Sequence, residues 1–134
     1  LKGRPSGEVE ALSAIPGITF LRGKEIKKFT KDMNEAEKEQ TRALHEGLFQ
    51  MAVERAGTCD LLVLDEALGA CATGLLDHDA LLAFLQDKPE ALEVVLTGRD
   101  PTAALLDAAD YVTEMCKRKH PYDQGVQARR GVEY

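Results

Sequence analysis

Short runs of leucine and β-branched residues alternate along this chain with segments whose apolar residues recur at helical spacing. This alternation is typical of β-α-β units, and it predicts an α/β fold with a mostly parallel sheet. We expect four runs to form strands: Ile18–Leu21, Leu61–Glu66, Glu93–Thr97 and Tyr111–Met115. The middle two are apolar at nearly every position, which favours central strands that are covered by helices on both faces.

The segments between these runs carry helix start and stop signals. Asn34, with Glu37 three residues on, has the pattern of a capping box and predicts the start of the longest helix. Gly57 is placed to end this helix in a left-handed conformation. The stripe expected to face the core lies at helical spacing and consists of Leu44, Gly47, Leu48, Met51 and Ala52.

Two further helix starts follow the expected central strands. Asp77 predicts the N-cap of a helix that ends at Lys88, because the residue before a proline avoids the helical region. Asp100 followed by Pro101 predicts a second start, since proline is tolerated at the first helical position. Ligands of open parallel sheets bind at the carboxyl edge, where these turns lie.

Length and composition bound the function. The chain has 134 residues, which fits a single α/β domain over residues 1–134. With 17 Lys plus Arg against 23 Asp plus Glu, the net charge of −6 has the wrong sign for a general nucleic-acid binder. The three cysteines form no C-x-x-C pair, so we expect buried, reduced thiols. No apolar run is long enough to span a bilayer or resembles a signal peptide, so we expect a cytoplasmic protein.

The first motif that could carry chemistry is the pair Asp65 and Glu66, which follows four apolar residues. Nucleotide-binding α/β domains use an acid in this position beside a bound Mg²⁺ ion, because magnesium prefers oxygen ligands and keeps several waters. The alternative is a strand that simply ends in two solvent-facing acids. Taken alone, the motif does not separate these two interpretations.

The second motif is Thr97, Gly98 and Arg99, which follow the next central strand. A hydroxyl group, a flexible backbone position and a guanidinium group before a helix start all suit phosphate oxygens. The alternative is an ordinary turn between a strand and a helix. A third motif is the basic tail, which runs from Lys117 to Asp123 and continues from Gln124 to Tyr134 with Arg129, Arg130 and Gly131. Its alternative is a solvated surface of the C-terminal region.

Several catalytic motifs are absent from the sequence. It contains no G-x-x-x-x-G-K-[ST] phosphate loop, no H-E-x-x-H and no G-x-S-x-G. The three histidines are far apart, and His45 is expected to be a partly exposed helix residue. Zinc hydrolases and serine hydrolases are therefore not supported.

In this order, the motifs resemble the P-loop type of ATP:corrinoid adenosyltransferase over nearly the whole chain. The segments that carry the resemblance are Leu1–Gly3, Gly23 with Phe29–Thr30, Leu62–Glu66, Leu96–Arg99, Ala109–Glu114, and Lys119–His120 leading to Gly125 and Gly131–Tyr134. The segment from Ala109 to Tyr134 is the most specific. The family's phosphate loop lies upstream of the position where Leu1 aligns, so we expect the chain to be the C-terminal major part of such an enzyme.

The resemblance implies a P-loop nucleotide-hydrolase-like fold, which is a Rossmann-like three-layer arrangement, and a homodimer. It implies alkyl transfer, in which the Co(I) of a reduced corrinoid (cobalamin) attacks the 5′ carbon of ATP and triphosphate leaves, with Mg²⁺ present. By this resemblance Asp65 and Glu66 hold the metal, and Glu66 and Arg99 are the catalytic residues. The residues expected to bind ATP or the corrinoid are Lys2, Phe29, Thr97, Gly98, Arg99, Lys119 and His120.

Two other functions stay open at this stage. One is a non-catalytic corrinoid- or nucleotide-binding homologue that has lost the phosphate loop, which the upstream coding sequence would separate from the enzyme. The other is a general P-loop ATPase, which would release inorganic phosphate rather than triphosphate.

Overall fold

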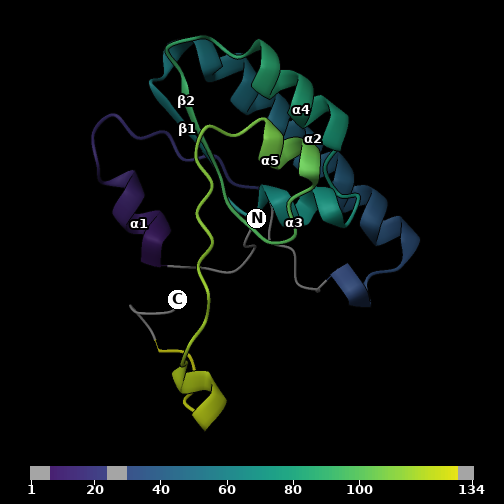
Figure 1. Ribbon diagram of the computed structural model, residues 1–134, viewed down its shortest axis with the longest axis vertical. Coiled ribbons are helices and arrows are strands. Elements are labelled where there is room, and N and C mark those ends of the chain that lie inside the picture. The colour runs from purple at the N-terminus through teal and green to yellow at the C-terminus, as the bar shows by residue number, and fades with distance from the viewer. Residues whose placement is uncertain (1–6, 24–29, 130–134) are drawn as a thin grey trace. The chain divides into compact units, whose positions relative to one another are not determined.

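The structure is a computed structural model that describes residues 7–23 and 30–129 (Figure 1). Contacts within the chain divide it into two compact units. The described residues of the first unit are 21–23 and 30–110, and those of the second are 7–20 and 111–129. No helix in the described ranges is long and apolar enough to cross a membrane.

The first unit has α/β architecture. Its regular elements, in chain order, are η1 (Thr30–Asp32), α2 (Glu35–Arg55), η2 (Ala56–Thr58), β1 (Leu61–Leu64), α3 (Ala67–Ala72), α4 (His78–Asp87), β2 (Glu93–Leu96) and α5 (Ala103–Asp107). Strands β1 and β2 pair in parallel, with Leu61 opposite Glu93 and Leu64 opposite Leu96. The two central strands expected from the sequence are therefore confirmed as neighbours in one sheet.

The two faces of this sheet differ. Leu64 and Leu96 pack against the core, whose buried members are Phe49, Ala67, Ala70, Leu75, Leu76, Leu81 and Leu105. On the other face Leu61, Val63 and Val95 are 55%, 52% and 44% exposed. Helices of this unit lie to one side of the two strands (Figure 1). Among the described residues helices cover one face of the two strands, so the expectation that helices cover both faces stays a prediction.

Helix α2 begins as the sequence predicts. Asn34 Oδ1 accepts a hydrogen bond from the Glu37 amide at 2.9 Å, and Glu37 Oε2 accepts one from the Asn34 amide at 2.9 Å. This capping box satisfies two amides that the first helical turn leaves without partners, and such caps contribute about 1 kcal/mol. The helix ends at Arg55 with Ala56 as its C-cap, so Gly57 follows the cap as predicted. Its predicted left-handed conformation is wrong, because Gly57 lies inside the 3₁₀ turn η2 and has no positive φ.

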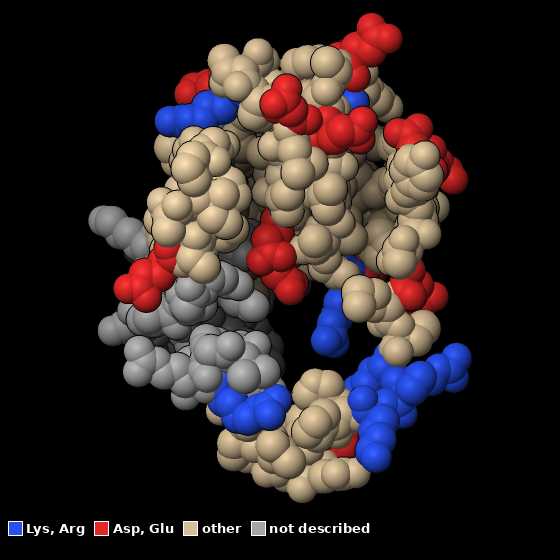
Figure 2. Space-filling model, turned by 90° about the vertical axis from the view of Figure 1, so that its left-hand side faces the viewer, with Lys and Arg blue, Asp and Glu red and all other residues tan. Residues whose placement is uncertain are grey.

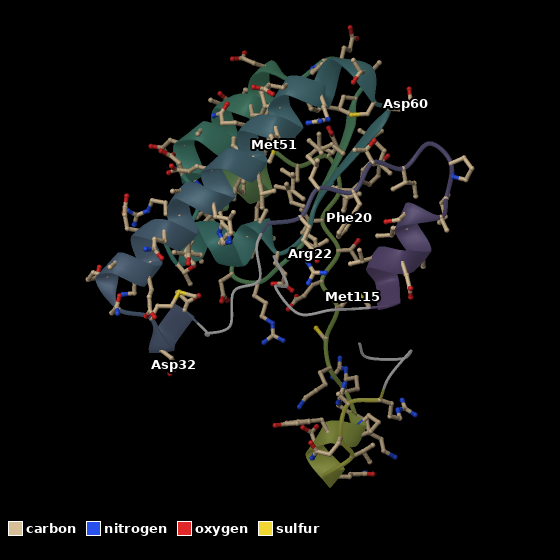
Figure 3. The ribbon with its side chains drawn as sticks, turned by 180° about the vertical axis from the view of Figure 1, so that it is seen from behind. Phe20, Arg22, Asp32, Met51, Asp60 and Met115 are labelled. Carbon is tan, nitrogen blue, oxygen red and sulfur yellow. The ribbon has the colours of Figure 1, made fainter. Side chains whose placement is uncertain are left out.

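The buried face of α2 is rotated from the predicted stripe. Its buried residues are Thr41, His45, Phe49 and Ala52, whereas Met51, labelled on α2 in Figure 3, is 39% exposed. The ring of Phe49 sets this orientation, since it packs edge-on against Phe84 of α4 with ring centroids 5.8 Å apart. Aromatic pairs favour this edge-to-face geometry and bury a large apolar area.

Helices α4 and α5 start with side-chain caps. Asp77 Oδ1 accepts from the amides of Asp79 and Ala80 at 2.8 and 2.9 Å, so the predicted start of α4 is confirmed, and the helix ends before Lys88. Helix α5 begins later than predicted. Its N-cap is Thr102, because Asp100 adopts a left-handed conformation with φ 56° that keeps Pro101 outside the helix.

The second unit contains α1 (Gly7–Ser13) and η3 (Pro121–Gln124) among its described residues. The predicted strands at residues 18–21 and 111–115 are not strands in this structure. An extended run becomes a strand only by pairing its backbone with a neighbour, and within the described ranges the sheet contains β1 and β2 alone. The side chains of Tyr111 and Met115 are each 94% exposed, so burial does not hold this run in place either.

Candidate functional site at the strand ends

The parallel register of β1 and β2 brings Asp65 and Thr97 together. Leu64 and Leu96 are the last paired residues of the two strands, and the next residue of each chain segment is Asp65 and Thr97 respectively. The Thr97 hydroxyl donates a hydrogen bond to Asp65 Oδ1 at 2.7 Å. The sequence motifs at the two strand ends therefore meet at one edge of the sheet, where open parallel sheets bind ligands.

Glu66 forms the turn between β1 and α3. It has φ 59° and ψ 19°, a left-handed conformation, and it occupies the N-cap position of α3. Such a conformation costs about 1–2 kcal/mol for a residue that has a Cβ atom. The Glu66 amide donates to Thr97 Oγ1 at 2.9 Å, which supplies a partner for a backbone group that the turn takes out of the ladder.

Gly98 allows the end of β2 to lie close to the first turn of α3. Its φ is +135°, and a Cβ atom added there would lie 2.9 Å from Leu68 Cβ and 3.0 Å from the Gly69 amide nitrogen. The Leu68 amide also donates to the Thr97 carbonyl at 3.2 Å. These contacts leave room for glycine alone at residue 98 and connect the two turns directly.

Arg99 follows in the loop between β2 and α5, and its side chain is exposed. The far end of this loop is held by Thr102, whose Oγ1 lies 2.8 Å from His78 Nε2 of α4. His78 Nδ1 in turn lies 2.9 Å from Asp79 Oδ1. The His78–Thr102 contact joins residues 24 positions apart that no sequence motif connects, so the sequence alone does not predict it.

Lys119 and His120 belong to the second unit. His120 caps η3, since its Nδ1 accepts a hydrogen bond from the Tyr122 amide at 3.1 Å. Lys117 Nζ binds both carboxylate oxygens of Asp123 at 2.9 and 2.8 Å. Figure 2 shows Lys and Arg side chains gathered on this C-terminal segment. Lys2 and Phe29, which the sequence analysis also placed in the site, lie outside the described residues.

The end of β1 offers carboxylate oxygens as ligands for a divalent metal ion. Asp65 and Glu66 are adjacent, exposed carboxylates. No group of three or more His, Cys, Asp or Glu side chains that could hold a metal occurs among residues 7–23 and 30–129. Two acids fit Mg²⁺, which keeps several waters and is usually held by one or two carboxylates plus substrate phosphates. They do not fit a metal that needs a complete cage of protein ligands.

Two pockets of the first unit are lined by residues away from the strand ends. A pocket of about 310 Å³ lies beside Arg42, Cys71, Asp77 and His78, and one of about 410 Å³ lies between α2 and α4 beside Phe49 and Phe84. Neither is lined by Asp65, Glu66, Thr97 or Arg99. Asp65, Glu66 and Arg99 at the strand ends are exposed, so the chemistry of this site comes from side chains that solvent reaches.

His45 is a second residue whose environment the sequence did not reveal. It is 5% exposed, so the expectation of a partly exposed helix residue is wrong. Neither ring nitrogen has a hydrogen-bond partner among the described residues. Burial lowers the pKa of the imidazole below its ordinary value, because the charged form loses its hydration.

The cysteines also differ from expectation. All three are free thiols, but Cys59 and Cys116 are exposed and Cys71 is half-buried. Burial raises the pKa of Cys71, and the negative charge of Asp77 raises it further.

Comparison with known proteins identifies one family over the whole chain. The family described as "ATP:corrinoid adenosyltransferase BtuR/CobO/CobP" matches residues 1–134. The corrinoid adenosyltransferase of Pseudomonas aeruginosa is 43% identical over 74 residues, which are 55% of this chain and 36% of that protein.

Two further relatives give the same pattern. A corrinoid adenosyltransferase of Sinorhizobium is 40% identical over 75 residues, covering 55% of this chain and 35% of the relative. Corrinoid adenosyltransferase CobA of Salmonella typhimurium is 36% identical over 75 residues, covering 56% of this chain and 38% of the relative. The alignments thus span between 35% and 38% of the length of these three curated relatives.

Proposed function

The chain belongs to the family of ATP:corrinoid adenosyltransferases, and on that premise we propose that it transfers the 5′-deoxyadenosyl group from ATP to the Co(I) of a reduced corrinoid. Triphosphate is the leaving group. The observation that carries the proposal is the 2.7 Å contact between Thr97 and Asp65, because it joins the two strand-end motifs on which the resemblance to the family rests. Curated relatives named corrinoid adenosyltransferases support the same activity.

The reaction requires the triphosphate to be held while negative charge gathers on it. In our proposal Arg99 binds phosphate oxygens with its two-pronged guanidinium group, and Gly98 lets the backbone approach them closely. Asp65 and Glu66 hold Mg²⁺, directly or through water. Magnesium, when bound, would neutralise part of the charge on the triphosphate. Glu66 and Arg99 are the residues that we propose to be catalytic.

The resemblance to the family also suggests roles for four residues away from the strand ends. Two of them lie outside the described residues, and two belong to the second unit. Lys2 and Phe29 are proposed to contact ATP and the corrinoid, with Phe29 near the lower face of the corrinoid. Lys119 and His120 are proposed to contribute from the basic C-terminal segment. Variants at these four residues would test each role separately.

The same family relationship supports several broader proposals. We propose a P-loop-like, three-layer domain with helices on both faces of the sheet. The apolar side chains of Leu61, Val63 and Val95 are exposed on the face opposite the core, which supports a further layer of helices there. A cytoplasmic homodimer that acts in cobalamin biosynthesis, without nucleic-acid or membrane partners, completes the proposal. A non-catalytic binding homologue is not favoured, because the family model that matches residues 1–134 and the curated relatives are those of adenosyltransferases.

An anaerobic adenosylation assay tests the activity. The longest available form of the protein is mixed with ATP, Mg²⁺ and reduced cobalamin, and the cobalamin spectrum and the phosphate products are followed. We expect adenosylcobalamin and triphosphate to appear together, only when the reduced corrinoid is present. Release of inorganic phosphate without corrinoid would instead identify an ATPase and contradict the proposal.

Substitutions at the two ends of β1 test the site. Asp65→Asn or Glu66→Gln should lower turnover at least tenfold, which corresponds to about 1.4 kcal/mol of barrier, with the fold retained. The matched control is Asp60→Asn, an exposed acid labelled just before β1 in Figure 3, at the opposite end of the same strand. If Asp65→Asn and Glu66→Gln turn over as fast as the control Asp60→Asn, neither acid holds the metal.

A further inference from the structure

The Thr97 hydroxyl forms hydrogen bonds with both acidic residues of the site, with the side chain of Asp65 and with the backbone amide of Glu66. It donates its one hydrogen to Asp65 Oδ1 at 2.7 Å and accepts a hydrogen bond from the Glu66 amide at 2.9 Å. A threonine hydroxyl has one hydrogen and two lone pairs. In this arrangement its hydrogen is already used, so it has none to donate to a phosphate oxygen.

The backbone of Thr97 adds two more bonds to the same region. Its amide donates to the Leu64 carbonyl at 3.2 Å, and its carbonyl accepts from the Leu68 amide at 3.2 Å. Thr97 thereby contacts the last residue of β1, both acids and the first turn of α3. Gly98 lies so close to Leu68 and Gly69 that even an added Cβ atom would overlap with them. The end of β2 therefore has little room to move toward α3.

Glu66 needs this support more than an ordinary turn residue does. Its left-handed backbone, with φ 59°, is unfavourable for a residue with a side chain and persists only when surrounding contacts hold it. The Glu66 carbonyl is fixed on the other side, since it accepts from the Ala70 amide at 3.1 Å. Relaxation of φ at Glu66 would change the direction in which its side chain leaves the backbone, and with it the position of the carboxylate relative to Asp65.

We propose that Thr97 is a positioning residue, whose hydroxyl holds Asp65 and Glu66 in the relative orientation in which they bind a divalent cation. It acts through the two acids, independently of any direct contact with the nucleotide. The inference rests on the proposed function for the identity of the ligand. The hydroxyl contacts themselves do not depend on that function.

Three variants of the full chain separate the hydroxyl from the shape of the side chain. Thr97→Val keeps the size and branching of threonine and removes the hydroxyl, whereas Thr97→Ser keeps the hydroxyl. Thr58→Val is the matched control, because the Thr58 hydroxyl bonds to the Arg55 carbonyl at 2.9 Å in η2, which precedes β1. Amide hydrogen exchange at Glu66, read by NMR, reports the turn. Mn²⁺ affinity, read from water proton relaxation, reports the acids.

We expect Thr97→Val to exchange the Glu66 amide at least tenfold faster and to bind Mn²⁺ at least tenfold more weakly than the wild type. Thr97→Ser should stay within threefold of the wild type in both measurements, and Thr58→Val should be unchanged. A role confined to packing would give the opposite result, because valine keeps the size and branching of threonine and serine does not. Wild-type Mn²⁺ affinity in Thr97→Val, or equal losses in the serine and valine variants, would overturn the inference.

The remaining outcomes are also decisive. If Thr97→Val does not fold, exchange in the wild type decides, because the inference requires slow exchange of the Glu66 amide although Glu66 is exposed. If the wild type binds no Mn²⁺, the inference fails together with the metal site of the proposed function. If Mn²⁺ binding follows the hydroxyl but no adenosylation occurs, the proposed function fails and the positioning role of Thr97 stands.

Discussion

Substitution of Gly98 by alanine would test whether the close approach between the end of β2 and α3 requires glycine. Two costs add at this residue. A backbone with φ +135° costs about 1–3 kcal/mol for a residue with a side chain. The new Cβ would lie 2.9 Å from Leu68 Cβ and 3.0 Å from the Gly69 amide nitrogen, and overpacking of this kind costs about 1–3 kcal/mol. We expect Gly98→Ala to lose about 2–6 kcal/mol of unfolding free energy.

Two other glycines supply matched controls in the same unit. Gly74 has φ +67° and its nearest atom to an added Cβ is Arg42 Nη2 at 4.0 Å, so Gly74→Ala carries conformational strain alone, about 1–2 kcal/mol. Gly47 lies within α2 and an added Cβ would meet nothing within 4 Å. Gly47→Ala should therefore stabilise the protein by about 1 kcal/mol through helix propensity.

Urea unfolding followed by far-ultraviolet circular dichroism measures all three variants. The expected order of stability is Gly47→Ala above the wild type, then Gly74→Ala, then Gly98→Ala. If Gly98→Ala loses no more than Gly74→Ala, the contact with α3 does not exclude a side chain. The connection between the two strand-end turns would then be looser than the distances indicate.

Three further predictions concern charge and ionisation. Arg99→Lys should weaken ATP binding about tenfold, or about 1.4 kcal/mol, because a point charge cannot make a two-pronged contact. Wild-type affinity by calorimetry would contradict this, and Arg55→Lys, at an exposed arginine in the last turn of α2, is the control. Burial lowers the pKa of His45, so the unfolded chain takes up a proton at this imidazole at a higher pH than the folded protein does. The free energy of unfolding is therefore highest above the unfolded pKa of about 6.5 and falls as the pH drops below it. Urea midpoints should therefore fall more between pH 7.5 and 5.5 in the wild type than in His45→Leu, and parallel curves would refute the assignment. Burial raises the pKa of the Cys71 thiol, so iodoacetamide at pH 8 should alkylate exposed Cys59 at least tenfold faster by mass spectrometry, and equal rates would count against the burial of Cys71.

Local signals predicted the helix starts better than they predicted the helix faces. The caps Asn34 and Asp77 act within three residues of themselves, so the sequence alone identified both. The buried face of α2 depends on what packs against it. Thr41 and His45 are polar, yet they are buried at 7% and 5% exposure, and no hydrophobic pattern would select them. The contact of Phe49 with Phe84 decided the orientation, and that pair is visible only in three dimensions.

The strand-end site was predicted in part for a similar reason. Neighbouring parallel strands must end at one edge, so the meeting of Asp65 with the segment after β2 followed from the order of the elements. The left-handed turn at Glu66 and the double role of the Thr97 hydroxyl could not be predicted, because no glycine or asparagine marks residue 66. Runs at residues 18–21 and 111–115 have strand composition, but composition does not supply the pairing partner that a strand requires.

The contact between Asp65 and Thr97 also determines when the site can form. These residues are 32 positions apart, and the segment between them includes α3 and α4. During translation the two acids therefore leave the ribosome well before the hydroxyl that orients them. The loop-closure entropy of this separation must be overcome before any cation finds its binding geometry, so a nascent chain that stops short of β2 carries both carboxylates and still has no assembled site.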